Sequence, residues 1–253
     1  MGPVGTKVEI INLLIGKYGF TSYLEIAAPT TGFLFGQVAR QGLERCDRIV
    51  YCCPPDFDDG ERIVWRSETA SLDAIAAELV RAGRRYDIVF VDSHHTYECS
   101  ARDLAFAFSL VSDRGLIVMH DAAPPALATT TPDFIAGDWT GQSYAALVDF
   151  LLLHPERPVY VVDIDWGVAV IGSAAGGPAT AGEAASAWRQ LPDDYSTRFA
   201  FFEANRAALL NLCSVGDFLR RERLGPFAPR HWRWPTGLWL NHRSVGHGKA
   251  IFR

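Results

Sequence analysis

The chain has 253 residues, of which 49% are hydrophobic, with a formal net charge of −5 and a sequence pI near 5.8. This length and apolar content predict one globular α/β domain with additions, not two equal domains. The acidic balance argues against the basic surface with which proteins neutralise nucleic-acid phosphates, so we expect no nucleic-acid partner.

The five cysteines are odd in number and lack the C-x-x-C spacing of structural zinc sites. They indicate a reducing compartment, and we expect a cytoplasmic protein. The chain starts without a basic leader and a long apolar core, and no apolar run is long enough to cross a bilayer. We therefore expect no association with membranes.

Apolar residues with helical spacing predict a first helix over residues 7–18, ending near Gly19. Strands and helices then alternate along the chain. Strands are expected in residues 22–29, 48–53, 62–67, 86–92 and 115–121. Helices are expected in residues 30–44, 71–83 and 99–112. Strands that are apolar on both faces and alternate with helices predict a parallel sheet covered by helices on both faces.

The alternation stops after Asp121. Residues 122–141 are rich in Pro, Thr and Ala, and we expect a long loop near the strand ends. A helix over residues 143–153 leads into two apolar runs around the turn 165–167, which predicts a tight hairpin at the sheet edge. These elements predict an α/β, Rossmann-like, doubly wound sheet of seven mostly parallel strands with an antiparallel edge hairpin.

We expect four segments along the chain. Residues 1–20 form an N-terminal helix, residues 21–173 the Rossmann-like domain, and residues 174–182 a flexible linker. Residues 183–253 form a C-terminal extension of helices and an aromatic tail. The tail suits either stacking on a sugar or aromatic ligand or packing between subunits, so a homo-oligomer through the C-terminal helices stays open.

Polar residues stand at the carboxyl ends of two of the expected strands. Asp92, His94 and His95 lie at the end of one strand, and His120 and Asp121 lie at the end of the next. In an open parallel sheet, ligands bind beyond the carboxyl ends of the strands, near the point where strand order reverses. Taken singly, Asp92 could cap a helix and Asp121 could accept from loop amides. Together, two acids and three histidines favour a functional site.

Several motifs resemble one enzyme family. The segments YLEIAAPTTG, YDIVFVDSHHTYE and GLIVMHD, with the later NRAALLNL, resemble class I S-adenosylmethionine-dependent methyltransferases. The similarity is to the metal-dependent O-methyltransferase branch, which includes macrocin-type sugar O-methyltransferases and catechol-type enzymes, and it spans roughly residues 8–172. The resemblance implies an enzyme that methylates a hydroxyl group of a small molecule, such as a sugar moiety, a phenol or another natural product.

The resemblance also implies where S-adenosylmethionine binds. Glu25 matches the acid that ends the first strand, and Gly32 ends the turn that admits the methionine moiety. Ser67 matches a contact near the adenosine. Ala27 stands where the family has glycine, and Cys53 stands where the family has an acid for the ribose hydroxyls.

At the reactive end, the resemblance implies Mg²⁺ or another divalent metal held by Asp92, His120 and Asp121. Asp92 would also adjoin the cofactor and would serve catalysis together with His95. His95, three residues past Asp92, would be the general base that deprotonates the acceptor hydroxyl. Mg²⁺ prefers oxygen ligands and lowers the pKa of a bound hydroxyl, while histidine titrates near neutrality.

The departures at Ala27 and Cys53 leave two alternatives open. In one, the same strand-end residues hold zinc or another transition metal for lyase, isomerase or hydrolase chemistry without S-adenosylmethionine. In the other, the chain is a methyltransferase-like partner subunit without activity of its own.

Overall fold

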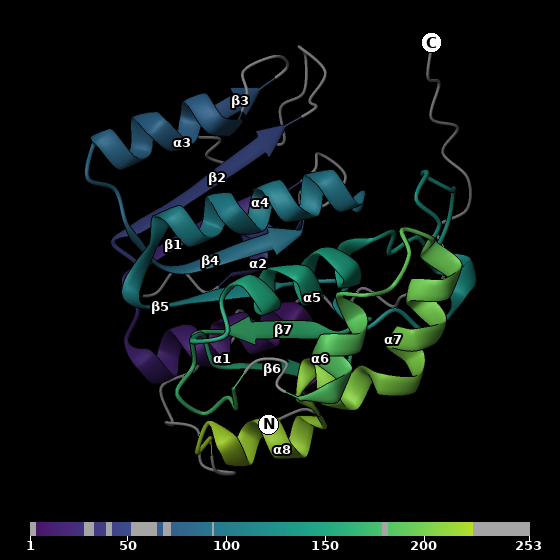
Figure 1. Ribbon diagram of the computed structural model, residues 1–253. Helices are drawn as coiled ribbons and strands as arrows, with labels where there is room; N and C mark the ends of the chain where they lie inside the picture. Colours follow the sequence, from purple (N-terminus) through teal and green to yellow (C-terminus); the bar gives the residue numbers. More distant parts are fainter. Residues whose placement is uncertain are drawn as a thin grey trace.

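A single sheet of eight strands organises the computed structural model, which describes residues 4–27, 33–38, 42–51, 65–67, 72–92, 94–178 and 182–224 (Figure 1). The strands are β1 (Ser22–Ala27), β2 (Arg45–Tyr51), β3 (Trp65–Ser67), β4 (Tyr86–Asp92), β5 (Val111–Met119), β6 (Val159–Val162), β7 (Val168–Ile171) and β8 (Leu212–Cys213). The helices are α1 (Lys7–Tyr18), α2 (Phe33–Gln37), α3 (Leu72–Arg81), α4 (Tyr97–Leu110), α5 (Ser143–Leu153), α6 (Glu183–Trp188), α7 (Tyr195–Leu210) and α8 (Val215–Arg221), with a short 3-10 helix η2 (Leu127–Thr129).

The strands lie in the order β3-β2-β1-β4-β5-β7-β6-β8. Strands β1 to β5 pair in parallel, whereas β7 runs antiparallel to both β5 and β6. Strand order reverses between β1 and β4, the place where doubly wound sheets bind ligands. The predicted fold class is confirmed, and the two-residue strand β8 adds an unpredicted parallel partner outside the hairpin.

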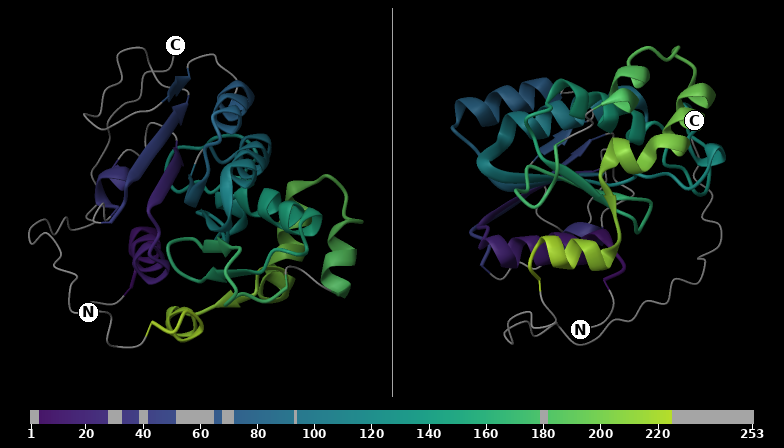
Figure 2. Two further views of the ribbon diagram at one scale, coloured as in Figure 1. Left: turned by 90° about the vertical axis from the view of Figure 1, so that its left-hand side faces the viewer. Right: turned by 60° about the horizontal axis from the view of Figure 1, so that its bottom comes forward.

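Helices cover both faces of this sheet, as Figures 1 and 2 show. On one face, Leu24 and Val89 belong to a core that includes residues of α4, α5 and α7. On the other face, Ile88 and Phe90 pack in a second core with residues of α1 and Phe218 of α8. Neighbouring residues of β4 thus enter opposite cores, because successive strand side chains point to opposite faces. This explains why the four central residues of β4, 88–91, are all apolar.

Local signals in the sequence account for the start and end of α1. Thr6 caps the helix in a capping box with Glu9, and Gly19 ends it in the left-handed conformation, with φ of 63°. The predicted bounds 7–18 are therefore confirmed. The bounds predicted for the helix α5 and the strand β4 are confirmed as well.

The turn between β6 and β7 is as tight as the sequence predicts. Asp165, Trp166 and Gly167 all have positive φ, of 49°, 60° and 89°. Two consecutive non-glycine residues in this conformation are uncommon, so the surrounding contacts must hold the turn in place.

The C-terminal segment returns to the sheet. The helices expected in the C-terminal extension are interrupted at Asn211, whose φ of 48° ends α7 and lets β8 pair with β6. Leu209, Leu210 and Phe218 are fully buried, so they are core residues of this chain. The predicted segment boundaries stay predictions, and the aromatic tail lies outside the described residues.

Among the described residues, no helix combines the length and the hydropathy that a membrane span requires.

Candidate functional site

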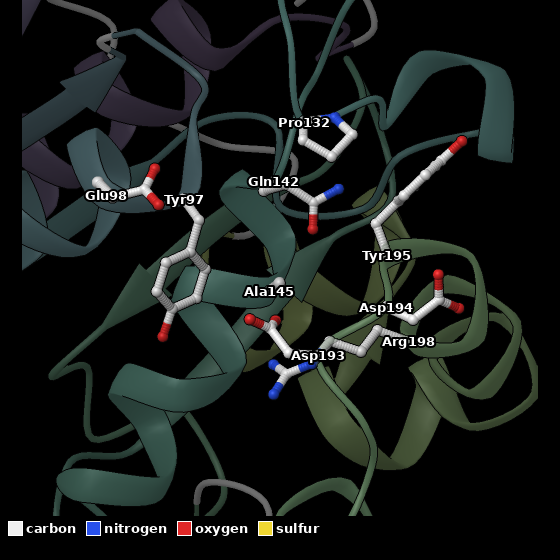
Figure 3. Close-up of a pocket in the computed structure, with 9 residues that line it drawn as sticks. All are labelled: Tyr97, Glu98, Pro132, Gln142, Ala145, Asp193, Asp194, Tyr195 and Arg198. Atoms are coloured by element: carbon white, nitrogen blue, oxygen red, sulfur yellow. The ribbon is translucent and has the colours of Figure 1, made fainter.

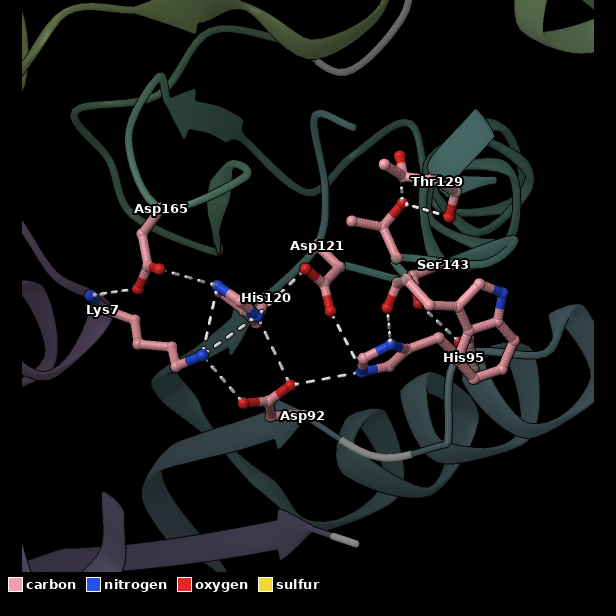
Figure 4. A network of polar contacts seen from close by, with 11 residues as sticks. Lys7, Asp92, His95, His120, Asp121, Thr129, Ser143 and Asp165 are labelled. Carbon is pink, nitrogen blue, oxygen red and sulfur yellow. Dashed lines mark hydrogen bonds and ion pairs between the residues drawn. The ribbon is translucent and has the colours of Figure 1, made fainter. Parts of the chain in front are cut away.

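The ends of β4 and β5 bring the predicted site residues together. Val91 pairs with Met119 across the two strands, and the backbone N–H of His120 donates to the carbonyl oxygen of Val91 at 3.1 Å. Asp92 therefore lies beside His120 and Asp121, as Figure 4 shows. This placement follows from the parallel register, which aligns the carboxyl ends of neighbouring strands.

Two imidazoles face the same pair of carboxylates. His95 Nε2 lies 3.0 Å from Asp121 Oδ2 and 3.6 Å from Asp92 Oδ1. His120 Nδ1 lies 3.2 Å from Asp121 Oδ1 and 3.4 Å from Asp92 Oδ1. Asp92, His120 and Asp121 are almost entirely buried, whereas the His95 side chain keeps 20% of its surface exposed. Of the two histidines, His95 is thus the more accessible to a ligand.

The loop after β5 holds His95 in one orientation. Its Nδ1 atom lies 2.8 Å from the carbonyl oxygen of Trp139, and its own carbonyl accepts from the N–H of Gln142 at 2.7 Å. The Trp139 ring centroid lies 5.4 Å from that of His95. A carbonyl oxygen only accepts hydrogen bonds, so in neutral His95 the proton is on Nδ1 and the Nε2 lone pair faces the carboxylates.

The backbone at Asp121 is constrained by the hairpin turn. Asp121 has φ of 56°, a conformation that costs energy unless neighbouring contacts hold it. The N–H groups of Ala122 and Ala123 donate to Gly167 and Trp166 at 3.1 and 2.8 Å. A Cβ atom on Gly167 would lie 2.4 Å from the nitrogen of Ala123, so only glycine permits this approach.

Lys7 and Asp165 complete the cluster, and neither residue was predicted from the sequence. Lys7 Nζ lies 3.2 Å from Asp92 Oδ2 and 3.1 Å from His120 Nδ1. Asp165 Oδ2 accepts from the backbone N–H of Lys7 at 3.1 Å, and its Oδ1 lies 3.5 Å from His120 Nε2. One signal was present in the sequence, because a lysine in the first helical turn opposes the helix dipole unless a carboxylate lies nearby.

The charges within the cluster shift the pKa of its members. Burial opposes the charged forms throughout, but His120 and Lys7 hold the pKa of Asp92 well below its usual range. The negative charges of Asp121 and Asp92 outweigh burial and raise the pKa of His120 well above its ordinary value. Burial likewise opposes the charged form of His95, yet the hydrogen bond to Asp92 and the charge of Asp121 raise its pKa. The cluster therefore favours positive charge between the carboxylates.

Asp92, His95 and Asp121 fit a divalent cation. Their ligand atoms all lie within 4.8 Å of one another. Neither oxygen of buried Asp121 receives a well-aligned hydrogen bond from the described residues, so both retain capacity for a ligand. Two carboxylates and one imidazole suit Mg²⁺, Mn²⁺ and related ions.

His120, predicted as a ligand, faces the same carboxylates from the side of Lys7 and Asp165 and is not part of the group of residues that fits the cation. His94 and Asp103 lie apart from this group: the His94 ring packs 5.2 Å from Trp139, and Asp103 pairs with Arg102 at 3.1 Å. The assignments of individual ligands and of the base stay predictions.

The predicted cofactor contacts are described only in part. Glu25 is fully buried on β1, where Oε1 lies 3.2 Å from Arg48 Nε and Oε2 accepts from Tyr23 Oη at 2.8 Å. Burial raises the pKa of Glu25 to about 7, although Arg48 and Tyr23 act against this shift. Ala27 ends β1 beside Asp92. Glu25 thus already has internal partners, a feature that the sequence did not reveal.

The other predicted cofactor residues lie at or beyond the limits of the described chain. Ser67 ends β3, but its side chain is not described, and Gly32 and Cys53 lie outside the described residues. Their proposed contacts with the cofactor stay predictions.

A cavity of about 670 Å³ lies between helices and a loop near the ends of the strands (Figure 3). It is formed by the starts of α4, α5 and α7 and by the loop after β5. Its lining includes Tyr97, Glu98, Gln142, Asp194, Tyr195 and Arg198. Gln142 connects the lining of the cavity to His95, because its backbone N–H donates to the carbonyl oxygen of His95.

Comparison with protein families finds one match. Residues 35–122 match the model of a family described as a methyltransferase domain. This segment contains Asp92, His95, His120 and Asp121. Comparison with curated protein sequences finds no match.

Solved structures with a similar chain trace include several O-methyltransferases. An O-methyltransferase from Bacillus cereus in complex with SAH is 12% identical, with 68% of this chain and 84% of that chain covered and a TM-score of 0.46. The O-methyltransferase TomG from Streptomyces achromogenes, in complex with SAM, is 14% identical, with 65% and 78% covered and a TM-score of 0.45. The MycE methyltransferase of the mycinamycin pathway, in complex with Mg, SAH and mycinamycin VI, is 13% identical, with 67% and 51% covered and a TM-score of 0.41.

Proposed function

We propose that this chain, of which residues 35–122 match the model of a methyltransferase domain, transfers the methyl group of S-adenosylmethionine to a hydroxyl group of a small molecule. The acceptor class is a sugar moiety, a phenol or another natural product. The observation that carries the proposal is the meeting of Asp92, His95 and Asp121 at the ends of β4 and β5. A divalent cation assists the reaction in this proposal.

The cofactor is proposed to lie across the carboxyl ends of β1 and β4. Strand order reverses there. Ala27 of β1 pairs with Asp92 of β4, so the two strand ends lie side by side where the cofactor is proposed to bind. The small side chain of Ala27 supports a close approach of the cofactor to the end of β1.

Asp92 and Asp121 are proposed to hold the divalent cation, which when bound lowers the pKa of the acceptor hydroxyl. His95 is proposed as the general base at Nε2, because its Nδ1–H donates to Trp139. One nitrogen cannot bind the ion and accept the proton at the same time. The two carboxylates therefore carry the ion in this proposal, and His95 acts on the acceptor. Methyl transfer then depends mainly on alignment of the reacting groups.

The cavity at the starts of α4, α5 and α7 is a candidate for part of the acceptor, because Gln142 in its lining contacts the backbone of His95. The tyrosines Tyr97 and Tyr195 offer ring faces, and Glu98 and Asp194 offer hydrogen-bond acceptors. Aromatic faces combined with carboxylates are suited to a polyhydroxylated or phenolic ligand.

The test is methyl transfer from labelled S-adenosylmethionine to a panel of phenols and glycosides, with Mg²⁺ and with a chelator. We expect product with at least one acceptor class, and a loss of about 100-fold or more when the metal is removed. Calorimetry with S-adenosylmethionine provides an independent readout, and absence of binding with and without metal would refute the proposal. The alternative, metal chemistry without S-adenosylmethionine, has no specific observation in its favour.

A further inference from the structure

We propose that the ammonium group of Lys7 acts as a cation within the strand-end cluster, which comprises Asp92, His95, His120, Asp121 and Asp165. It competes with a divalent ion for interaction with the Asp92 carboxylate and thereby limits the affinity of the protein for that ion. The inference deepens the proposed function, because it takes the carboxylates of Asp92 and Asp121 as the cation site. It assigns a role to the first helix of the chain, which lies outside the matched domain segment.

The two cations would act on one carboxylate from different sides. Lys7 Nζ lies 3.2 Å from Asp92 Oδ2, whereas the other oxygen, Oδ1, faces both imidazoles at 3.6 and 3.4 Å. Figure 4 shows the ammonium group at the side of His120 and Asp165, across Asp92 from His95. Lys7 and the divalent ion each weaken the attraction of Asp92 for the other, because each neutralises part of the carboxylate charge.

The fold delivers the Lys7 side chain to this position. Thr6 and Glu9 fix the start of α1, and the backbone N–H of Lys7 donates to Asp165 Oδ2 in the hairpin turn. The buried residues of α1 anchor the helix against the sheet. Only 17% of the Lys7 side chain is exposed, so the ammonium group is held close to the carboxylates instead of ranging through solvent.

The charges of the cluster favour a cation. Asp92, Asp121 and Asp165 bring three carboxylates, and Lys7 brings one ammonium group. Without this ammonium group the carboxylates attract a divalent ion more strongly.

The experiment measures Mn²⁺ binding to the full-length protein by titration calorimetry. The proteins are the wild type, Lys7→Met, Lys7→Arg and a matched control, Lys17→Met, which removes a lysine from the same helix, where its ammonium contacts Glu222 and not the cluster. We expect Lys7→Met to bind Mn²⁺ about tenfold more tightly than the wild type. Lys7→Arg and Lys17→Met should remain within about twofold of the wild type, because both keep a positive charge at residue 7.

Unchanged or weaker binding in Lys7→Met would overturn the inference, and so would absence of Mn²⁺ binding in all four proteins. A merely structural role for Lys7 predicts weaker binding, the opposite direction, and melting curves establish that each variant is folded. Methyl transfer is measured separately. Tighter Mn²⁺ binding in Lys7→Met without any methyl transfer would refute the proposed function and leave the role of Lys7 standing.

Discussion

His95 Nδ1 lies 2.8 Å from the carbonyl oxygen of Trp139, and this contact presents Nε2 of the neutral ring to Asp92 and Asp121. The carbonyl belongs to the loop after β5, whereas His95 precedes α4. The orientation of the proposed base thus depends on a contact between two segments that are 44 residues apart in the sequence.

Replacement of His95 tests the proposed base directly. His95→Gln keeps a side chain of similar length that can still donate to Trp139, but it removes the basic nitrogen. We expect kcat for methyl transfer to fall about 100-fold or more, while the affinity for S-adenosylmethionine changes less than about threefold. The measurement is transfer from labelled S-adenosylmethionine together with calorimetry of cofactor binding.

The neighbouring histidine provides the control for this change. His94 packs against Trp139, and it is not part of the group of residues that fits the cation. His94→Gln should therefore keep kcat within about fivefold of the wild type. Equal losses in the two variants would mean that the segment as a whole matters and that His95 is not the base.

Asp121→Asn should weaken the cation site. The variant retains the shape of the side chain, and asparagine tolerates the positive φ at this position. It removes one of the two carboxylate charges proposed to hold the ion, so we expect Mn²⁺ affinity to fall at least about tenfold. Titration calorimetry measures the change. Asp163→Asn, at an exposed residue near the hairpin turn, is the control and should leave Mn²⁺ affinity unaltered.

Gly141 should be required for the position of His95. A Cβ atom on Gly141 would lie 2.1 Å from the His95 carbonyl oxygen, and its φ is +53°. We expect Gly141→Ala to lower the free energy of unfolding by about 2–4 kcal/mol and to reduce methyl transfer, because the loop or His95 must move. Denaturant unfolding and the transfer assay measure the two effects.

A second glycine of the same loop distinguishes the effect of backbone strain from the effect of a steric clash of the added Cβ atom. Gly137 has φ of +103°, and a Cβ atom there would meet nothing within 4 Å among the described residues. Gly137→Ala should lower the free energy of unfolding by only about 1–2 kcal/mol and leave methyl transfer near the wild-type rate. If Gly141→Ala and Gly137→Ala change stability and methyl transfer equally, the close approach of Gly141 to His95 does not contribute to function.

Much of the fold could be predicted because its signals are local. The continuous apolar run of β4 predicts a strand that is buried on both faces, and the capping box and Gly19 mark the ends of α1. Strand β8 could not be predicted, because Leu212 and Cys213 are too few to show a period. Their pairing with β6 depends on the left-handed turn at Asn211 and on tertiary contacts.

Some contacts of the candidate site could likewise be predicted from the sequence, and others could not. Asp92, His95 and Asp121 could be predicted, because the carboxyl ends of adjacent parallel strands must meet. Lys7 and Asp165 lie 158 residues apart, and their contact arises from the packing of α1 against the sheet, for which the sequence carries no period. The ion pair of Glu25 with Arg48 likewise depends on the register of β1 and β2. Local patterns predict the strand ends and the helix α1, but not the place where this helix packs on the sheet.

Glu222 should anchor the C-terminal helix α8 in a pH-dependent manner. Its carboxylate is fully buried and accepts hydrogen bonds from Tyr160 and Ser173, both at 2.6 Å, and from Tyr18 at 2.8 Å. Lys17 pairs with the same group. Burial opposes ionisation, but these donors outweigh it and lower the pKa of Glu222 below its ordinary value of 4.5.

A lowered pKa in the folded state means that the ionised carboxylate stabilises the fold above the unfolded-state pKa, and that this contribution is lost as the pH falls through the folded-state pKa. We therefore expect Glu222→Gln to lower the free energy of unfolding by about 2–4 kcal/mol at pH 7, with a difference from wild type that shrinks below about pH 4. Glu203→Gln is the control, because Glu203 is 51% exposed and lies 4.0 Å from Arg206. It should cost less than about 0.5 kcal/mol at any pH. Urea unfolding of the three proteins between pH 3 and 7 measures the effect, and a constant penalty for Glu222→Gln across this range would show that ionisation of Glu222 does not explain its contribution to stability.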